Sequence, residues 1–341
     1  MTKNFENKNE VVINGLGLLA QYILSFPESL KDKMTEAFYK NQWFTLANQE
    51  LMLQSIAKNY LDRLKLSEWI SNYKIKNHEP KKIGIVMAGN IPLVGFHDLL
   101  CVWLSGNIAL VKLSSKDEAL LPFLVKQLEI LSPEFKGKTI FSDRLNDADA
   151  IIATGSNNSA RYFEYYFKKN PHIIRNNRSS VAFLTGDESG DIILELGKDI
   201  FRYFGLGCRN VSKLFLPVGY DPKKIFEGLS IYSEINQHNK YKNNFDYNLT
   251  ILLMNKTPHL HNEFFILQEN QKTVSPIATI YYEFYTPEND LKEKLSVNEK
   301  DIQCIVGKNY IPFGKAQEPS LSDYADQIDV LNFLSGINEN G

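Results

Sequence analysis

Residues 81–115 read KKIGIVMAGNIPLVGFHDLLCVWLSGNIALVKLSS, and this stretch decides the fold class. It begins with a short apolar run of β type that closes at Gly89 and Asn90. A segment with helical spacing of its apolar residues follows at 93–106, and a second apolar run leads to Lys112. Strands that alternate with helices of about 10–15 residues indicate βαβ units on a parallel sheet.

The same alternation continues toward the C-terminus. Helical spacing returns at 117–131, an apolar run follows at 148–156, and another helix is predicted at 158–169. Beyond these, we expect strands at 179–186, 211–220, 248–255 and 278–285 and helices at 190–205 and 222–236. The Asn- and Lys-rich stretch from His238 to Tyr247 is predicted to be a surface loop. The sequence therefore predicts an α/β protein with parallel sheets.

The segment that precedes this alternation is of another kind. From Glu10 to Tyr73, apolar residues recur three or four apart with charges between them, which predicts an α-helical N-terminal segment. A polar stretch, Asn77 to Pro80, separates it from the first strand. We expect a domain boundary further on, between Thr185 and Gly190.

Composition and charge exclude several classes of protein. The 341 residues carry a formal net charge of −2, so the chain offers a nucleic acid no excess of positive charge. Its three cysteines, Cys101, Cys208 and Cys304, are too few and too far apart for a disulfide framework, and no C-x-x-C pair suggests zinc. No stretch reaches the roughly 18 apolar residues of a membrane span. We therefore expect a protein of the cytoplasm.

The hexapeptide Gly205 to Asn210, GLGCRN, lies between a predicted helix and a predicted strand. A cysteine flanked by small residues at such a junction can expose its sulfur in a cleft, and nearby N–H groups and a cation favour the thiolate. Cys208 is therefore the candidate nucleophile. The alternative is a buried structural cysteine, which is the commoner role of a lone cysteine.

Two further turns follow predicted strands at the edge where open α/β sheets bind ligands. Asn90 could donate its side-chain amide to an oxyanion, although an asparagine beside Gly89 is also a common turn residue. The sequence from Thr154 to Ser156 opens a helix, so its backbone N–H groups could bind a phosphate. An ordinary N-cap serine would give the same pattern.

Several familiar motifs are absent from the sequence. No G-x-G-x-x-G fingerprint follows a strand, and there is neither a P-loop nor a G-x-S-x-G motif. His259 and His261 lie close to Glu263 in the sequence, but they have no partner set for a metal and are expected on a surface loop.

Taken in order, these segments resemble the aldehyde dehydrogenase superfamily. HEPKKIGIVMAGNIPLVGF (78–96) resembles its His-Glu-Pro stretch, first strand and asparagine-bearing turn, without the tryptophan of that turn. GLGCRNVSKLFLPVGYD (205–221) resembles the nucleophile segment. The resemblance implies that Cys208 is the catalytic cysteine and that Asn90 and the Cys208 backbone N–H stabilise the oxyanion.

Two more segments carry the resemblance on the cofactor side. SGNIALVKLSS (105–115) resembles the strand whose lysine contacts the adenine ribose, which places Lys112 there with Ser114 and Ser115 after it. DADAIIATGSNNSA (147–160) resembles the strand and turn under the pyrophosphate, which matches Gly155 and Ser156. The resemblance thus implies a nicotinamide cofactor and no metal.

The resemblance also implies the architecture. We expect an aldehyde dehydrogenase-like α/β fold with two Rossmann-like parallel-sheet domains behind an α-helical N-terminal segment. The expected parts are a helical segment at 1–76, a dinucleotide-binding domain at 77–186, a catalytic domain at 187–325 and a C-terminal tail at 326–341.

One departure from the superfamily pattern points to a reaction. In hydrolytic members a glutamate activates the water that releases the acyl-enzyme, whereas the corresponding stretch here, IIRNNRSSVAFL (173–184), has no carboxylate. An enzyme without that base should exchange its acyl group with a thiol. Together with the C-terminal stretch at 313–334, GLGCRN looks most like the LuxC-type family of fatty acyl-CoA reductases.

The expected reaction is therefore the reduction of an acyl-CoA to an aldehyde. Ser115 and Lys116 stand where NAD-using members often carry a glutamate, which favours NADPH over NADH as the reductant. The expected partners are an acyl-CoA or acyl-carrier thioester and a second copy in a homodimer, with no nucleic acid and no membrane span. The alternatives are an aldehyde-oxidising dehydrogenase and a non-reducing, acyl-carrying or scaffold subunit of the same fold.

Two roles stay open at this stage. The general acid is not visible in the sequence, and His97, His172 and His238 are its candidates. The superfamily's glutamate for the nicotinamide ribose has no match, because counting back from Pro276 gives Lys272, and Glu269 fits only a longer loop.

Overall fold

A computed structural model describes residues 2–76, 78–286, 288–297 and 299–339. The chain divides into two compact units, which we describe separately: unit 1 comprises Met1–Asn176 and Pro319–Gly341, and unit 2 comprises Asn177–Glu318. Asn77, where the predicted dinucleotide-binding domain begins, lies outside the described residues. The functional parts expected at 1–76, 77–186, 187–325 and 326–341 stay predictions, because the two units are divisions by packing alone.

Unit 1 contains a five-stranded parallel sheet with the order β3-β2-β1-β4-β5. The three central strands are almost wholly apolar and buried, as expected of a parallel sheet covered on both faces. The edge strand β3 is short and partly exposed. The strands are β1 (Lys82–Val86), β2 (Ile108–Lys112), β3 (Thr139–Phe141), β4 (Ala150–Thr154) and β5 (His172–Arg175).

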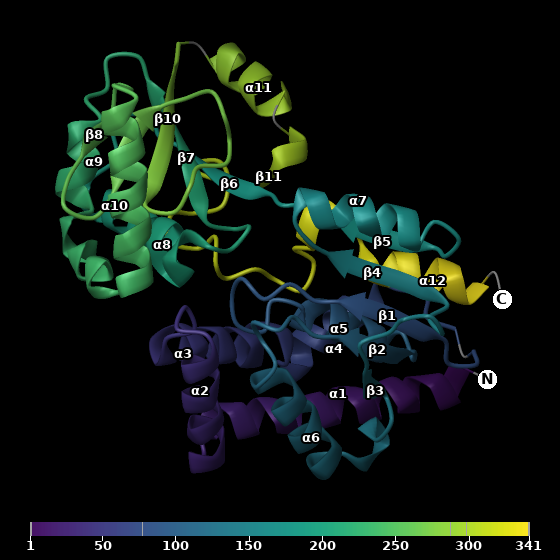
Figure 1. Ribbon diagram of the computed structural model, residues 1–341. Helices are drawn as coiled ribbons and strands as arrows, with labels where there is room; N and C mark the ends of the chain where they lie inside the picture. Colours follow the sequence, from purple (N-terminus) through teal and green to yellow (C-terminus); the bar gives the residue numbers. More distant parts are fainter. Residues whose placement is uncertain (1, 77, 287, 298, 340–341) are drawn as a thin grey trace. The chain divides into compact units, whose positions relative to one another are not determined.

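The predicted N-terminal helices are confirmed and pack in the core of unit 1 (Figure 1). Leu16, Leu19 and Ile23 of the first helix are fully buried, and that helix packs on α6. The helices before the sheet are α1 (Thr2–Ser25), α2 (Glu28–Lys40), α3 (Leu46–Ser55), the π-helix η1 (Ile56–Tyr60) and α4 (Arg63–Ser71). Within the described residues, no single helix is long and apolar enough to cross a membrane. Among these residues, only the bent pair formed by α1 (from Asn9) and α2 is long and apolar enough for a membrane span, and this rests on length and composition alone.

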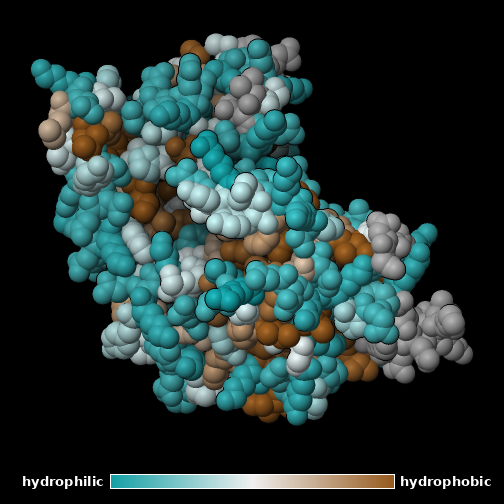
Figure 2. Space-filling model, turned by 45° about the vertical axis from the view of Figure 1, so that its right-hand side comes forward, coloured by the Kyte–Doolittle hydropathy of each residue, from teal (hydrophilic) through white to brown (hydrophobic). Residues whose placement is uncertain are grey.

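The remaining helices of unit 1 connect its strands or close the unit at its C-terminus. They are α5 (Phe96–Leu104), α6 (Leu120–Leu131), the 3₁₀ turn η2 (Pro133–Phe135), α7 (Asn157–Tyr166), the 3₁₀ turn η6 (Ala325–Gln327) and α12 (Val330–Glu339). Every residue of α5 except His97 is buried, which fits a helix that connects β1 to β2. Hydrophilic residues cover most of the face seen in Figure 2, with smaller apolar areas between them.

Unit 2 contains a second sheet, with the order β11-β6-β7-β10-β9-β8. All pairs in it are parallel except β8 with β9. The strands are β6 (Ser179–Phe183), β7 (Val211–Pro217), β8 (Leu260–His261), β9 (Ile266–Glu269), β10 (Thr279–Tyr285) and β11 (Ile302–Val306). The prediction of two parallel-sheet α/β regions is therefore confirmed.

The helical elements of unit 2 confirm two predictions. The helix expected at 190–205 is α8 (Gly190–Phe201) with the turn η3 (Arg202–Gly205), and that at 222–236 is α9 (Lys223–Gly228) with the 3₁₀ helix η4 (Ser230–Gln237). Two short elements, α11 (Glu288–Val297) and η5 (Glu299–Asp301), precede β11.

The region 238–255 corrects the sequence analysis. The expected loop at His238–Tyr247 and the expected strand at 248–255 are one helix, α10 (Asn239–Met254). His238 caps it, because its Nδ1 accepts a hydrogen bond from the Tyr241 N–H. Tyr241 and Phe245 lie four residues apart on one face of this helix, and both are buried. Their packing favours a helix although the apolar run after Asn248 is typical of a strand.

Candidate active site

Three strands of unit 1 end together at one edge of the sheet. Val86 of β1 lies in register with Lys112 of β2 and with Ala153 of β4. The chain passes from β1 through α5 to β2 on one side, while β4 adjoins β1 on the other. The strand order therefore reverses between β1 and β4. Open α/β sheets bind ligands at such a switch point, outside the carboxyl ends of the strands.

The loop after β1 lies against the segment after β2. A Cβ atom on Gly89 would stand 2.5 Å from Ser114 Oγ and 3.1 Å from Lys116 Cβ, so only glycine permits this approach. Asn90, the candidate oxyanion donor, follows at once and is half-buried. The close approach fixes the backbone that carries Asn90 against the candidate ribose segment.

Asp117 holds the same loop, and sequence reasoning did not single it out. Its Oδ2 accepts a hydrogen bond of 2.7 Å from the Leu93 N–H, and Leu93 has a left-handed backbone with φ of 54°. Burial raises the pKa of the Asp117 carboxyl to about 6, opposed by the bond from Leu93. Asp117 opens the helix predicted at 117–131 and looks like a helix cap in the sequence, so only the fold shows its link to the loop.

The predicted turn from Thr154 to Ser156 opens α7, as expected. Ser156 is the N-cap residue, and its Oγ accepts a hydrogen bond of 3.2 Å from the Ser159 N–H. A Cβ on Gly155 would lie 2.8 Å from Ser159 Cβ and 2.9 Å from a ring carbon of Phe163. The first turn of α7 therefore packs directly on the glycine, and its N-terminus faces the carboxyl edge of the sheet.

The other cofactor candidates lie at the end of β2. Lys112 and Ser115 are exposed, and Ser114 is half-buried with its Oγ accepting a hydrogen bond from the Lys116 N–H. No acidic side chain occurs from 112 to 116, and the carboxylate of Asp117 points to Leu93. The edge thus combines an ammonium group, hydroxyls and a helix N-terminus, a donor set that fits the phosphates and ribose of a dinucleotide.

Cys208 lies in unit 2, in a turn between α8 and β7, as the sequence predicts. Asn210 builds this turn. Its Oδ1 accepts a hydrogen bond of 2.8 Å from the Gly207 N–H, and its Nδ2 donates to the carbonyl oxygens of Asp199, Ile200 and Arg202 at the end of α8. Asn210 is 1% exposed, so its amide both caps the helix and fixes the turn.

Ser180 of β6 anchors the cysteine residue itself. Its Oγ donates a hydrogen bond of 3.1 Å to the backbone oxygen of Cys208 and lies 3.0 Å from Cys304 Sγ. Ser180 is fully buried, whereas Cys208 and Cys304 are half-buried. Cys101 differs from both, because complete burial raises the pKa of its thiol well above the usual value.

Two bulky residues before the turn have unusual backbones. Tyr203 and Phe204 have φ values of 53° and 57°, and Gly205 follows with 74°. A left-handed conformation costs a residue with a side chain about 1 kcal/mol or more, so packing must hold it. Tyr203 and Phe204 are 3% and 9% exposed, and the Phe204 ring packs at a tilt against His238 with ring centroids 4.3 Å apart.

The histidine candidates have structural contacts. His97 Nε2 bonds the Leu321 oxygen, His172 pairs with Glu164, and His238 caps α10. His261 belongs to the two-residue strand β8 (Leu260–His261), which corrects the loop predicted there, whereas His259 lies in the loop before this strand. Among the residues that the structure describes, no group of three or more His, Cys, Asp or Glu side chains could hold a metal.

The structure gathers the predicted site residues in two places. Unit 1 brings Asn90, Lys112, Ser114, Ser115, Gly155 and Ser156 to one sheet edge. Unit 2 holds Cys208 in its turn. Sequence reasoning missed Asp117, Ser180 and Asn210, because their roles depend on partners in other segments.

Comparison with known proteins identifies a family and a fold. A family profile described as "Acyl-CoA reductase (LuxC)" matches residues 4–227. No curated protein matches the chain significantly.

Solved structures of aldehyde dehydrogenases resemble this chain. An aldehyde dehydrogenase from Bacillus cereus in complex with NAD+ has 12% identity and a TM-score of 0.63 over 87% of this chain and 71% of its own. Aldehyde dehydrogenase 21 from Physcomitrella patens, in complex with succinate, has 11% identity and a TM-score of 0.62 over 97% and 84%. A mutant of aldehyde dehydrogenase C from Pseudomonas syringae, with NAD+ and octanal, has 10% identity and a TM-score of 0.63 over 88% and 73%. At these identities, the likeness shows the fold, which is aldehyde dehydrogenase-like.

Proposed function

Since the chain belongs to the LuxC family of acyl-CoA reductases, we propose that it reduces an acyl-CoA through an acyl-enzyme on Cys208, with NADPH as the reductant. The family and the fold make the chain an oxidoreductase of the aldehyde-forming type. The observation that carries the proposal is the turn at Cys208, in which Ser180 and Asn210 fix a half-buried thiol between a helix and a strand.

The first step is acyl transfer to the cysteine. The Cys208 thiolate attacks the carbonyl carbon of the thioester, a carbon–sulfur bond forms, and the coenzyme A thiolate leaves and takes up a proton. Negative charge develops on the carbonyl oxygen during the attack. We assign its stabilisation to the backbone N–H of Cys208 and to the side-chain amide of Asn90.

The carboxyl edge of unit 1 is the place for the cofactor. Lys112 and Ser115 would hold the adenosine ribose and its 2′-phosphate, and the first turn of α7 at Gly155 and Ser156 would hold the pyrophosphate. When bound, NADPH supplies the hydride that converts the thioester carbonyl to an aldehyde. Release of the aldehyde returns Cys208 to the thiolate.

The stretch 173–184 favours a reductase over an aldehyde-oxidising enzyme. In hydrolytic superfamily members, by resemblance, this stretch carries the glutamate that activates water, and here it contains no carboxylate. Without such a base, hydrolysis of the acyl-enzyme is slow. The thioester on Cys208 then persists until it is reduced or returned to coenzyme A.

Intact-protein mass spectrometry tests this proposal. The wild type, Cys208→Ala and Cys304→Ala are each mixed with a series of acyl-CoAs, with and without NADPH. We expect an acyl adduct on the wild type and on Cys304→Ala, which discharges as aldehyde when NADPH is added, and none on Cys208→Ala. An adduct that survives NADPH would instead indicate an acyl-carrying subunit, and no adduct with any thioester would overturn the assignment of Cys208.

A further inference from the structure

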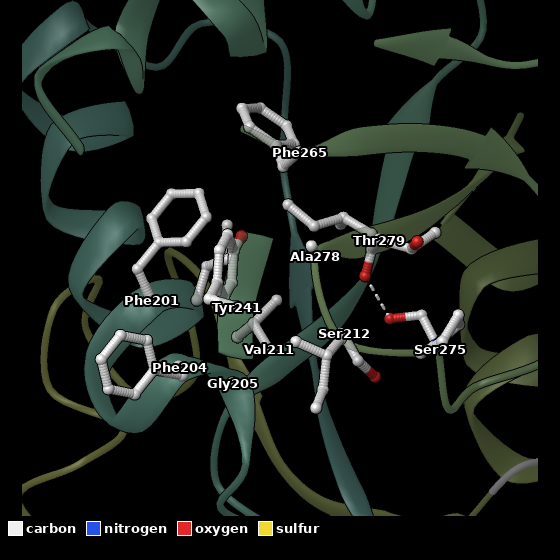
Figure 3. Close-up of a pocket in the computed structure, with 14 residues that line it drawn as sticks. Phe201, Phe204, Gly205, Val211, Ser212, Tyr241, Phe265, Ser275, Ala278 and Thr279 are labelled. Carbon is white, nitrogen blue, oxygen red and sulfur yellow. Dashed lines mark hydrogen bonds between the residues drawn. The ribbon is translucent and has the colours of Figure 1, made fainter. Parts of the chain in front are cut away.

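Unit 2 contains a cavity beside the cysteine turn (Figure 3). Its volume is about 30 Å³, enough for two or three groups of the size of a water molecule. Phe201, Phe204 and Tyr241 lie on one side of the view in Figure 3, and Ser275 and Thr279 on the other.

The cavity adjoins both flanks of the nucleophile turn. Gly205 lies three residues before Cys208 and Val211 three residues after it, and both line the cavity. The segment that carries the thiol thus begins and ends at the cavity wall. A group attached to Cys208 therefore leaves a segment whose two ends line this cavity.

Two hydroxyl groups in the lining have no hydrogen-bond partner among the described residues. They are Oη of Tyr241, a residue that is 1% exposed, and Oγ1 of Thr279, which is 5% exposed. Buried hydroxyls are normally paired, because an unpaired one loses its hydration without compensation. Burial raises the pKa of the Tyr241 phenol, so this hydroxyl stays protonated and can donate. Apolar walls with two donors fit a small apolar group that carries a hydrogen-bond acceptor.

We propose that this cavity binds the end of the acyl group on Cys208 and selects an acyl chain with a hydrogen-bond acceptor, such as a keto oxygen, near its end. The inference rests on the proposed function, since it assumes that Cys208 carries the acyl group. Tyr241 and Thr279 are then specificity-determining residues, whose hydroxyls donate to the acceptor. The size of the cavity limits the part of the chain that enters it to about three non-hydrogen atoms.

A competition experiment tests the proposal. Enzyme is mixed with equal amounts of two acyl-CoAs of the same length, one plain and one with a keto group next to the terminal methyl, for chains of about four to about eight carbons. The ratio of the two adducts is read by intact-protein mass spectrometry. The variants are Tyr241→Phe, which removes one hydroxyl, and Thr279→Val, which replaces one by a methyl group of similar size. The control is Tyr247→Phe, the same change at an exposed position of α10.

For at least one chain length, we expect the wild type and Tyr247→Phe to prefer the keto chain. Each hydroxyl deletion should lower that preference by about threefold to tenfold, the effect of one hydrogen bond. Adducts that form on Cys208 in the same ratio in all four proteins would overturn the inference, while the acyl-enzyme would stand. A wild type that forms no adduct at all would contradict the proposed function instead. Since two separate variants are used, misfolding of one leaves the other decisive.

Discussion

The hydroxyl of Ser180 donates a hydrogen bond of 3.1 Å to the backbone oxygen of Cys208, which lies 28 residues further along the chain. A single buried side chain on β6 thus fixes the peptide that carries the candidate nucleophile. Ser180→Ala should lower kcat/KM for acyl-CoA reduction by about threefold to tenfold, because the turn loses this anchor. The rate at which Cys208 is alkylated, measured across a pH series, should change as well. Steady-state kinetics gives kcat/KM, and labelling with an alkylating reagent gives the alkylation rate.

Ser230→Ala is the matched control for this change. Ser230 is exposed, and its Oγ donates to a carbonyl oxygen one turn earlier in the chain, so its removal should alter neither rate. If Ser180→Ala retains wild-type kcat/KM and alkylation, Ser180 does not position the cysteine.

A second prediction concerns pH and Asp117. Burial raises the pKa of this carboxyl from 3.8 to about 6, so the folded chain binds a proton that the unfolded chain releases. The stabilisation from that proton is complete below about pH 4 and is lost as the pH rises through about 6. Asp117→Asn keeps an oxygen for the Leu93 N–H and cannot ionise. It should therefore flatten the decline of the unfolding free energy between about pH 4 and pH 7, by about 2–3 kcal/mol.

Urea denaturation at several pH values measures this decline. Asp199 shows a similar rise of its pKa, to about 6, because of burial, so the double variant with Asp199→Asn should be flatter still. A wild-type slope that persists in Asp117→Asn would exclude this carboxyl as its source.

The third prediction concerns the choice of cofactor. Ser115→Glu places a carboxylate where the 2′-phosphate of NADPH is expected, and repulsion should raise the KM for NADPH by about tenfold or more. The KM for NADH should change less, because NADH has a hydroxyl at that position. Ser71→Glu, the same change of charge at an exposed helix end, is the control. Equal effects on both cofactors would place the phosphate elsewhere.

The fourth prediction concerns Gly155. An alanine there would bring its Cβ to 2.8 Å from Ser159 Cβ, so the first turn of α7 must shift. We expect the Kd for NADPH, measured by fluorescence titration, to rise by about tenfold while acylation of Cys208 persists. Gly336→Ala in α12 meets no atom within 4 Å and should leave the Kd unchanged. Unaltered binding in Gly155→Ala would remove this turn from the cofactor site.

Strands β1, β2, β4, β6, β7 and β10 and the helix–turn–strand context of Cys208 could be predicted from the sequence. Most positions in these strands are apolar, as in IGIV (83–86), which is rich in β-branched residues, or in the run LFLP (214–217) of β7. The edge strand β3 has three residues and β8 has two, too few for any pattern. The prediction of a loop and a strand in the region of α10 was wrong. The first half of this helix is rich in Asn and Lys and the second half is apolar, so the local composition did not reveal that Tyr241 and Phe245 pack on the core from one helix face.

The supports of the candidate site could not be predicted in the same way. Asn210 was quoted with the cysteine motif, yet its bonds to the end of α8 depend on how the chain folds back over ten residues. Ser180 and Asp117 act on segments that are remote in sequence, with no spacing to reveal them. Patterns in the sequence indicate where reactive groups lie along the chain, whereas the residues that hold them emerge from tertiary contacts.

The most direct test of the central claim is a single-turnover measurement on isolated acyl-enzyme. The wild type is acylated with an acyl-CoA, freed of all coenzyme A by gel filtration, and mixed with NADPH while aldehyde and free acid are quantified against the thioester on Cys208. The account predicts that each thioester yields one aldehyde and that the intact mass returns to that of the free enzyme. A thioester that stays on the protein, or that leaves only as the free acid, would contradict it.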